Sequence, residues 1–187
     1  MIPGNKSTTR YSKSKLSAAM LALVLAGASA PTLYEQFLKE KEGTRLTAYQ
    51  DGVGIWTICG GLTRINGRPV KQTDSLSAAT CDELDKAEQE RGLRELARIV
   101  KVPLSEPAKA GIASFCIHNI GLSKCKDSTF LRLLNEGKRN EACAQITRWI
   151  YDGGKDCRIK RNNCGGQPVR RMQEDELCLI TTGEPIQ

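Results

Sequence analysis

The sequence predicts an α+β fold with two lobes, a small antiparallel β-sheet lobe and a mainly helical lobe, with a cleft between them. Residues 46–70 mix glycines with β-branched residues and contain the pair Asn66 and Gly67, which is typical of short hairpins. After Ser77 the apolar residues recur at helical spacing instead. The chain has 187 residues, 40% of them hydrophobic, enough for one such domain with an N-terminal extension.

The first helix of this domain is expected over 32–42, where Thr32 is a suitable N-cap. Leu33, Phe37 and Leu38 then share one apolar face, so this helix should pack against the helical lobe. The β segment follows, and its β-branched residues include Val53, Ile55, Ile58 and Ile65.

A long helix is expected from Ser77 to about Val100, with Pro103 ending the helical run. Gly92 lies inside this helix, and glycine weakens a helix interior. We therefore expect a kink or a break at Gly92.

Shorter helices are expected in the remainder of the chain. Ser105 is a predicted N-cap with Pro107 in the first turn, a position where proline is tolerated. Residues 155–166 are polar and should form a loop. The other predicted helices span 128–135, 140–151 and 169–180.

The eight cysteines indicate disulfide bonds formed in an oxidising compartment such as the periplasm. No CxxC pair occurs, and the single histidine, His118, cannot complete a usual Cys/His zinc set. Buried free thiols are the alternative. Eight cysteines allow 105 pairings, but short separations favour Cys157 with Cys164 and, less strongly, Cys116 with Cys125. The other cysteines are Cys59, Cys81, Cys143 and Cys178.

The net charge of +7 and pI near 9.0 imply attraction to a polyanion. Candidates are peptidoglycan with its carboxylates, anionic lipid and nucleic acid, and the alternative is that the charge only aids solubility. The sequence lacks a basic region studded with aromatic residues and any nucleic-acid motif, so nucleic acid is not an expected partner.

The N-terminus has the pattern of an export segment. Basic residues precede residues 16–30, an uncharged stretch of fifteen that is rich in alanine. Cleavage after Ala28 is conceivable, whereas Pro31 disfavours cleavage after Ala30. The stretch is weakly apolar compared with the roughly 20 apolar residues of a membrane-spanning helix. The basic residues are Lys6, Arg10, Lys13 and Lys15.

Glu42, Asp51 and Thr57 have a spacing that suggests cleavage of a glycosidic bond. Glu42 ends the predicted helix, while Asp51 and Thr57 follow in the β segment, so the two carboxyl groups should have different environments. Glycosidic cleavage requires one acid that is protonated and one that is ionised. Taken singly, these residues also fit a solvated glutamate, a turn aspartate and a strand threonine.

Five ordered blocks resemble the phage-type lysozymes of glycoside hydrolase family 24, and the likeness runs from about Tyr34 to Leu179. One block is the Glu42, Asp51 and Thr57 segment, which carries the family's Glu-Gly, Tyr-x-Asp and Gly-x-Trp-Thr pattern. The others are Ser114-Phe115-Cys116-Ile117-His118-Asn119-Ile120-Gly121, Ser128-Thr129-Phe130-Leu131 with Leu133-Leu134-Asn135, Arg148-Trp149 with Gly153-Gly154, and Arg170-Arg171 before Glu174.

The resemblance implies a role for each site residue. Glu42 is the general acid, and burial should raise its pKa. Asp51 stays ionised to position the attacking water or to stabilise the transition state, and Thr57 holds that water. Arg170 pairs with Glu42 and orients it, although this pairing opposes the rise in pKa. The alternative is that Arg170 forms a basic surface pair with the arginine that follows it. Asn119 lines the substrate cleft.

The chain also departs from the family pattern. Leu62 stands where the family often has a histidine, and Gly60 removes a side chain from the cleft wall. Trp149 lies at packing spacing on a predicted helix, so we interpret it as a core residue rather than one that stacks on substrate.

The resemblance thus implies a lysozyme-like fold and an exported endolysin. This muramidase would hydrolyse the β-1,4 bond between N-acetylmuramic acid and N-acetylglucosamine in peptidoglycan for host lysis, without a metal or organic cofactor. We expect a monomer with a basic signal-anchor segment at 1–31 and a catalytic domain at 32–187. Such an anchor, of the signal-arrest-release kind, would tether the enzyme at first to the inner membrane, facing the host periplasm. The alternatives are a cleaved signal peptide, a lytic transglycosylase, and a non-catalytic basic protein that binds wall or membrane.

Overall fold

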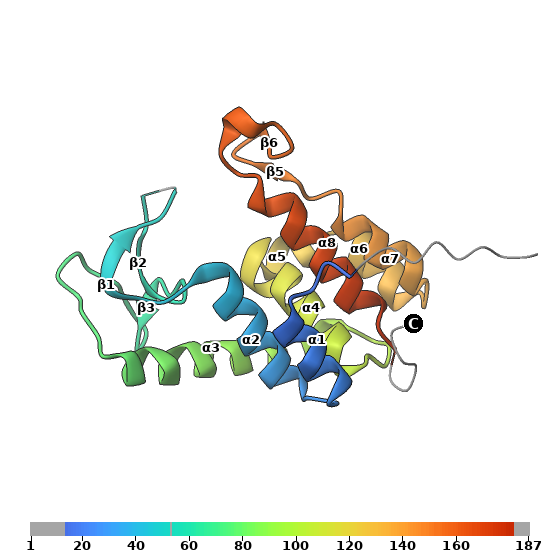
Figure 1. The fold of residues 1–187 in the computed structure, drawn as a ribbon, viewed down its shortest axis with the longest axis horizontal. Helices are drawn as coiled ribbons and strands as arrows, with labels where there is room; N and C mark the ends of the chain where they lie inside the picture. The colour runs from blue at the N-terminus through green and yellow to red at the C-terminus, as the bar shows by residue number, and fades with distance from the viewer. Residues whose placement is uncertain (1–13, 53, 182–187) are drawn as a thin grey trace, which may run out of the picture.

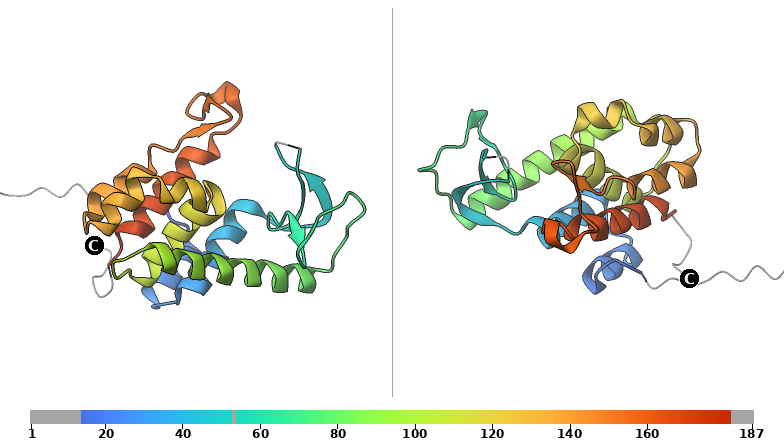
Figure 2. Two further views of the ribbon diagram at one scale, coloured as in Figure 1. Left: turned by 180° about the vertical axis from the view of Figure 1, so that it is seen from behind. Right: turned by 90° about the horizontal axis from the view of Figure 1, so that it is seen from above.

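A computed structural model describes residues 14–52 and 54–181 (Figure 1). Three of the basic N-terminal residues, Lys6, Arg10 and Lys13, and the expected strand residue Val53 lie outside the described residues. The described chain forms a small β lobe and a larger helical lobe, and the long helix α3 (Ala78–Ile99) connects them (Figures 1 and 2). The predicted α+β class is confirmed.

The β lobe consists of two short ladders rather than one continuous sheet. β1 (Arg45–Gln50) pairs antiparallel with β2 (Trp56–Cys59), and β3 (Arg64–Ile65) pairs antiparallel with β4 (Arg68–Pro69). The chain turns sharply after β2, where Gly61 has a φ of 107°, and this turn separates the ladders. The predicted turn at Asn66 and Gly67 is present, and both residues have positive φ.

From residue 14 onward, two helices precede the β lobe, α1 (Ala18–Leu25) and α2 (Ala30–Glu42). Leu16 and Met20 are buried in the core of the helical lobe, so α1 lies against its outer side (Figure 2). None of the helices in the described ranges is both long and apolar enough to cross a membrane.

Helix α2 buries the predicted apolar face, with Leu33 and Phe37 fully buried. It begins two residues before the expected start, and Ser29 rather than Thr32 is its N-cap. The backbone N–H of Ala30 donates to Oε2 of Glu106 at 2.6 Å, which ties the start of α2 to the helical lobe.

Helix α3 runs without a break through Gly92, so the predicted kink is wrong. Gly92 is buried, and a Cβ atom there would lie 3.1 Å from Cγ2 of Ile117. The glycine therefore permits close packing of α3 against residues 114–119, the segment that contains Ile117. Ser77 caps α3 as predicted, with its hydroxyl accepting from the Thr80 backbone N–H.

The helical lobe is completed by several shorter elements. The helix expected over 140–151 ends at Ile146, and the loop expected after it begins as a hairpin, because Gly153 and Gly154 adopt positive φ values that form its turn. The elements are α4 (Glu106–Ala113), the π-helix η1 (Ser114–Asn119), α5 (Leu122–Lys126), α6 (Thr129–Asn135), α7 (Arg139–Ile146), β5 (Tyr151–Asp152), β6 (Lys155–Asp156), η2 (Lys160–Asn162) and α8 (Gly166–Leu179).

All eight cysteines are paired, which confirms the disulfide interpretation. Both local pairs expected from the sequence, Cys157 with Cys164 and Cys116 with Cys125, are present. The remaining bonds join separate elements: one attaches the end of β2 to α3, and the other attaches α7 to α8. These long-range pairs are Cys59–Cys81 and Cys143–Cys178.

Gly111 permits the close contact between α4 and α8, which gives a test of the packing. A Cβ atom at Gly111 would lie 2.6 Å from Cβ of Leu177 and 3.0 Å from the carbonyl oxygen of Glu174. We expect Gly111→Ala to lower the free energy of unfolding by about 1–3 kcal/mol, because overpacking outweighs the gain in helix propensity. Urea unfolding measures the effect. The control is a separate variant, Gly166→Ala, because a Cβ atom at Gly166 would meet nothing within 4 Å. Equal stability of the two variants would contradict it.

Candidate active site

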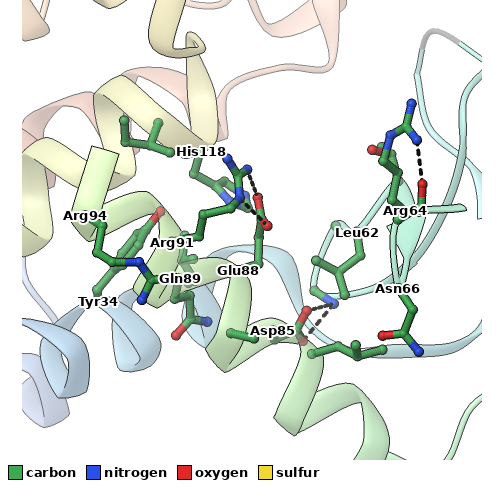
Figure 3. Close-up of a pocket in the computed structure, with 18 residues that line it drawn as sticks. Tyr34, Leu62, Arg64, Asn66, Asp85, Glu88, Gln89, Arg91, Arg94 and His118 are labelled. Carbon is green, nitrogen blue, oxygen red and sulfur yellow. Dashed lines mark hydrogen bonds and ion pairs between the residues drawn. The ribbon is translucent and has the colours of Figure 1, made fainter. Parts of the chain in front are cut away.

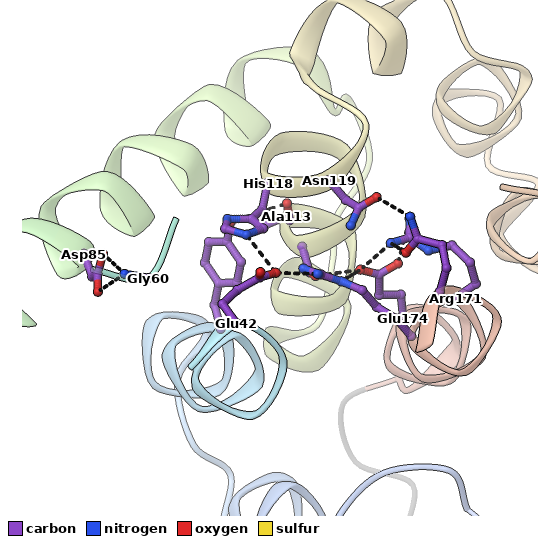
Figure 4. A network of polar contacts seen from close by, with 12 residues as sticks. Glu42, Gly60, Asp85, Ala113, His118, Asn119, Arg171 and Glu174 are labelled. Carbon is purple, nitrogen blue, oxygen red and sulfur yellow. Dashed lines mark hydrogen bonds and ion pairs between the residues drawn. The ribbon is translucent and has the colours of Figure 1, made fainter. Parts of the chain in front are cut away.

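Glu42 is the last residue of α2, and its side chain points toward η1 and α8 (Figure 4). Its Oε1 atom accepts from Nη1 of Arg170 at 2.5 Å and also lies 3.0 Å from Nε2 of His118. The side chain of Glu42 is 29% exposed, against 10% for Arg170. The predicted contact between Glu42 and Arg170 is therefore present, and a histidine joins it.

The electrostatic environment lowers the pKa of Glu42 to about 2. Burial raises this pKa, but the His118 hydrogen bond and the charge of Arg170 together outweigh burial. The expectation of a raised pKa is therefore wrong for this structure. The opposing effect of Arg170 was expected, whereas the His118 hydrogen bond, the larger of the two lowering effects, was not.

Arg170 is held by a buried ionic network that reaches along α8. Its Nε donates to Oε1 of Glu174 at 3.1 Å, and the Ser114 hydroxyl donates to the same oxygen at 2.6 Å. Arg171 is fully buried and forms an ion pair with Glu174 at 3.1 Å. The alternative interpretation, a basic surface pair, is therefore wrong. Burial raises the pKa of Glu174, and Arg171 and Arg170 oppose that shift.

Asp51 and Thr57 lie on the hairpin that follows α2. Oδ1 of Asp51 accepts from the Ile55 backbone N–H at 2.9 Å, which folds the turn between β1 and β2. Thr57 is buried in β2 opposite Tyr49, and its hydroxyl donates to the Ile55 carbonyl oxygen at 3.0 Å. Both predicted residues thus gather at one end of the hairpin, around Ile55.

A cavity of about 820 Å³ lies between the two lobes (Figure 3). The loop after β2 forms one wall, α3 the opposite wall, and η1 contributes His118. Glu42 does not line this cavity, but it contacts the ring of His118, which does. The predicted cleft between sheet and helices is therefore present, and Glu42 lies beside it. The labelled lining residues are Tyr34, Leu62, Arg64, Asn66, Asp85, Glu88, Gln89, Arg91, Arg94 and His118.

A contact with Asp85, which the sequence did not reveal, explains why position 60 is a glycine. Its backbone N–H donates to the Asp85 carboxylate, at 3.0 Å and 3.2 Å from the two oxygens (Figure 4). A Cβ atom at Gly60 would lie 2.8 Å from Oδ2 of Asp85, so a larger residue would displace this carboxylate. Burial raises the pKa of Asp85, although the bond from Gly60 opposes the shift.

The π-helix η1 presents two polar residues toward α2 and α8, His118 and Asn119. It closes with a hydrogen bond from the Ile120 backbone N–H to the Phe115 carbonyl at 3.0 Å. Such wide turns are frequent at functional sites. The amide oxygen of Asn119 accepts from Nε2 of Gln167 at 3.4 Å, and a substrate contact of Asn119 stays a prediction. Sequence reasoning missed His118 as a site residue, although it was the single histidine and lay inside a matched block.

Trp149 packs edge-on against Phe115, with ring centroids 5.8 Å apart, which confirms its interpretation as a core residue. In the described ranges no cluster of three or more His, Cys, Asp or Glu side chains is placed to hold a metal ion.

A β-hairpin lobe and a helical lobe on either side of a cavity, with a carboxylate at the end of α2, the helix that leads into the β lobe, define a lysozyme-like protein. The sequence model of the phage lysozyme family matches residues 39–174. The chain belongs to the phage lysozyme family.

Relatives and solved structures agree with this assignment. The SAR-endolysin of Escherichia phage 933W is 56% identical over 162 residues, which cover 87% of this chain and 92% of that protein. A probable prophage lysozyme of Escherichia coli (strain K12) is 55% identical over 162 residues, which again cover 87% of this chain and 92% of that protein. The solved structure of an endolysin from Escherichia coli O157:H7 phage FAHEc1 matches with a TM-score of 0.66 and 27% identity, over 90% of this chain and 95% of that one.

Proposed function

We propose that this protein is an endolysin whose muramidase activity depends on Glu42 as the general acid. The substrate is the β-1,4 bond between N-acetylmuramic acid and N-acetylglucosamine in peptidoglycan. The observation that carries the proposal is the placement of Glu42 beside the interlobe cavity, with the cationic Arg170 on its Oε1 atom. Membership of the phage lysozyme family supports the same reaction.

The reaction requires Glu42 to be protonated when substrate is bound. A sugar chain that extends from the cavity over Glu42 displaces water from its carboxyl group, and this desolvation raises the pKa of Glu42. Glu42 then gives its proton to the glycosidic oxygen as the bond breaks. On the other side of the sugar, the side chain of Asp51 and the hydroxyl of Thr57 position the attacking water in this proposal.

Glu42→Gln tests this assignment, because it keeps the shape of the side chain and removes the transferable proton. We expect clearing of purified peptidoglycan to slow by roughly 10²–10⁴-fold, the usual contribution of general-acid catalysis. Asp51→Asn should also be severe. Glu83→Gln, an exposed position on α3, is the matched control and should leave the rate unchanged. A Glu42→Gln rate within a few-fold of the unmodified enzyme would exclude the general-acid role.

The chemistry of the products separates hydrolysis from lytic transglycosylation, in which the C6 hydroxyl of the sugar replaces water. The proposal assigns Asp51 and Thr57 to the attacking water, so we expect mass analysis of the digested wall to show reducing N-acetylmuramic acid ends. Anhydro ends would contradict the hydrolytic mechanism. Killing of bacteria that survives Glu42→Gln would instead indicate a non-catalytic protein that binds wall or membrane.

The N-terminal segment acts, in this proposal, as a releasable signal-anchor that exports the enzyme and first tethers it to the inner membrane. Relatives that carry the name SAR-endolysin support this role. In the folded protein Leu16 and Met20 belong to the protein core, and the Ala30 N–H bonds to Glu106. A bilayer location of residues 16–30 is incompatible with those contacts. Tethering would therefore leave the start of α2 without its partners until release.

Three alanines of α1 give a test that spares the buried contacts. Ala18, Ala19 and Ala22 are exposed in the folded protein, so leucine at these positions strengthens membrane insertion without entering the core. We expect the triple leucine variant to remain in the membrane fraction and to delay host lysis. Serine at the same three positions is the control and should release sooner. Equal fractionation of both variants, or a mature N-terminus at Ser29 or Pro31, would rule out the anchor.

A further inference from the structure

We infer that His118 is a positioning residue that holds Oε1 of Glu42 as an acceptor, so that the transferable proton lies on Oε2. The inference rests on the proposed role of Glu42 as general acid. It concerns a contact that the catalytic sequence motif does not contain, because His118 comes from the π-helix η1.

The imidazole ring of His118 lies between Glu42 and the turn after β2. Nε2 lies 3.0 Å from Oε1 of Glu42, and both side chains are less than one-third exposed. On the other side the ring lies beside Gly61, since a Cβ atom there would be in ordinary van der Waals contact with Cε1 of His118, at 3.6 Å. Gly61 has a φ of 107°, a conformation that favours glycine.

Two donors on one oxygen determine where the acid proton resides. Arg170 can only donate, and His118 donates from Nε2 either as the neutral Nε2–H tautomer or as the imidazolium. A proton on Oε1 would displace one of these donors, so protonated Glu42 carries its hydrogen on Oε2. When the Oε2 proton moves to the glycosidic oxygen, the resulting carboxylate retains both donors, and its charge is stabilised.

Other charged groups also face His118. Glu42 comes from α2 and Arg170 from α8, and Asp85 on α3 interacts with the ring electrostatically. The ion pair of Glu88 and Arg91 on α3 and the β-lobe residue Arg64 line the same cavity. Within the described part of the chain, the only side chain that hydrogen-bonds to His118 is Glu42.

The contact between His118 and Glu42 predicts the direction in which the pH dependence of activity should change. The His118 hydrogen bond lowers the pKa of Glu42 against the effect of burial, which raises it. Loss of the bond therefore raises this pKa and extends the protonated range of the free enzyme to higher pH. Since kcat/KM reports the ionisation of free enzyme, its alkaline limb should move upward by about one pH unit.

The experiment compares His118→Phe, which keeps a planar ring without a donor, with His118→Gln, which restores a neutral N–H donor. Carbon-13 titration of the Glu42 carboxyl by NMR gives its pKa in the full chain without any need for activity. We expect His118→Phe to raise the Glu42 pKa by about one unit and to move the alkaline limb of kcat/KM with it. His118→Gln should return both values most of the way to those of the unmodified enzyme. Thermal unfolding checks that each variant is folded.

An unchanged Glu42 pKa in His118→Phe would overturn the inference, whatever happens to the rate. So would a shift in His118→Gln equal to that in His118→Phe, because that result would reflect packing rather than the donor. Failure of the proposed function is a separate outcome. In that case Glu42→Gln remains active, while the NMR titration still reports the His118 contact.

Discussion

The ion pair between Arg170 and Glu42 is the contact on which the site depends, because it joins the end of α2 to α8. Arg170 is nearly buried, and a buried arginine requires partners for its charge. Glu174 provides the second partner inside α8, and Ser114 completes the set from η1. Three segments that are distant in the sequence thus meet at one guanidinium group.

The rest of the fold maintains this meeting point. Gly111 brings α4 against α8, and the Cys143–Cys178 bond attaches α8 to α7. The β lobe is attached separately, since the Cys59–Cys81 bond fastens β2 to α3 and the Gly60 N–H bonds to Asp85. Glu42 lies at the junction of the two lobes, because α2 belongs to the helical lobe and leads directly into β1. A carboxyl group at this point can face substrate while its donors come from the helical lobe.

Local signals predicted much of the fold, whereas contacts between distant segments escaped sequence reasoning. Ser77 was identified as a helix cap because a cap depends on a few neighbouring residues. The predicted kink at Gly92 is wrong because the glycine is required by close packing against Ile117, a residue of another segment. The pairing of Arg170 with Glu42 was expected only from family resemblance. The low pKa of Glu42 could not be predicted, since it required His118, which a wide π turn brings into contact.

The same contacts that position Glu42 oppose its chemistry in the free enzyme. A carboxyl group whose pKa is about 2 in the folded protein, against an ordinary value of 4.5, stabilises the fold above pH 4.5. This contribution is lost as the pH falls through the folded pKa. At neutral pH the ionised, paired state of Glu42 is therefore the stable one. Proton donation requires substrate binding to reverse that preference. Binding energy from the sugar chain along the cavity must then raise the Glu42 pKa, which makes desolvation of this one carboxyl group a part of catalysis.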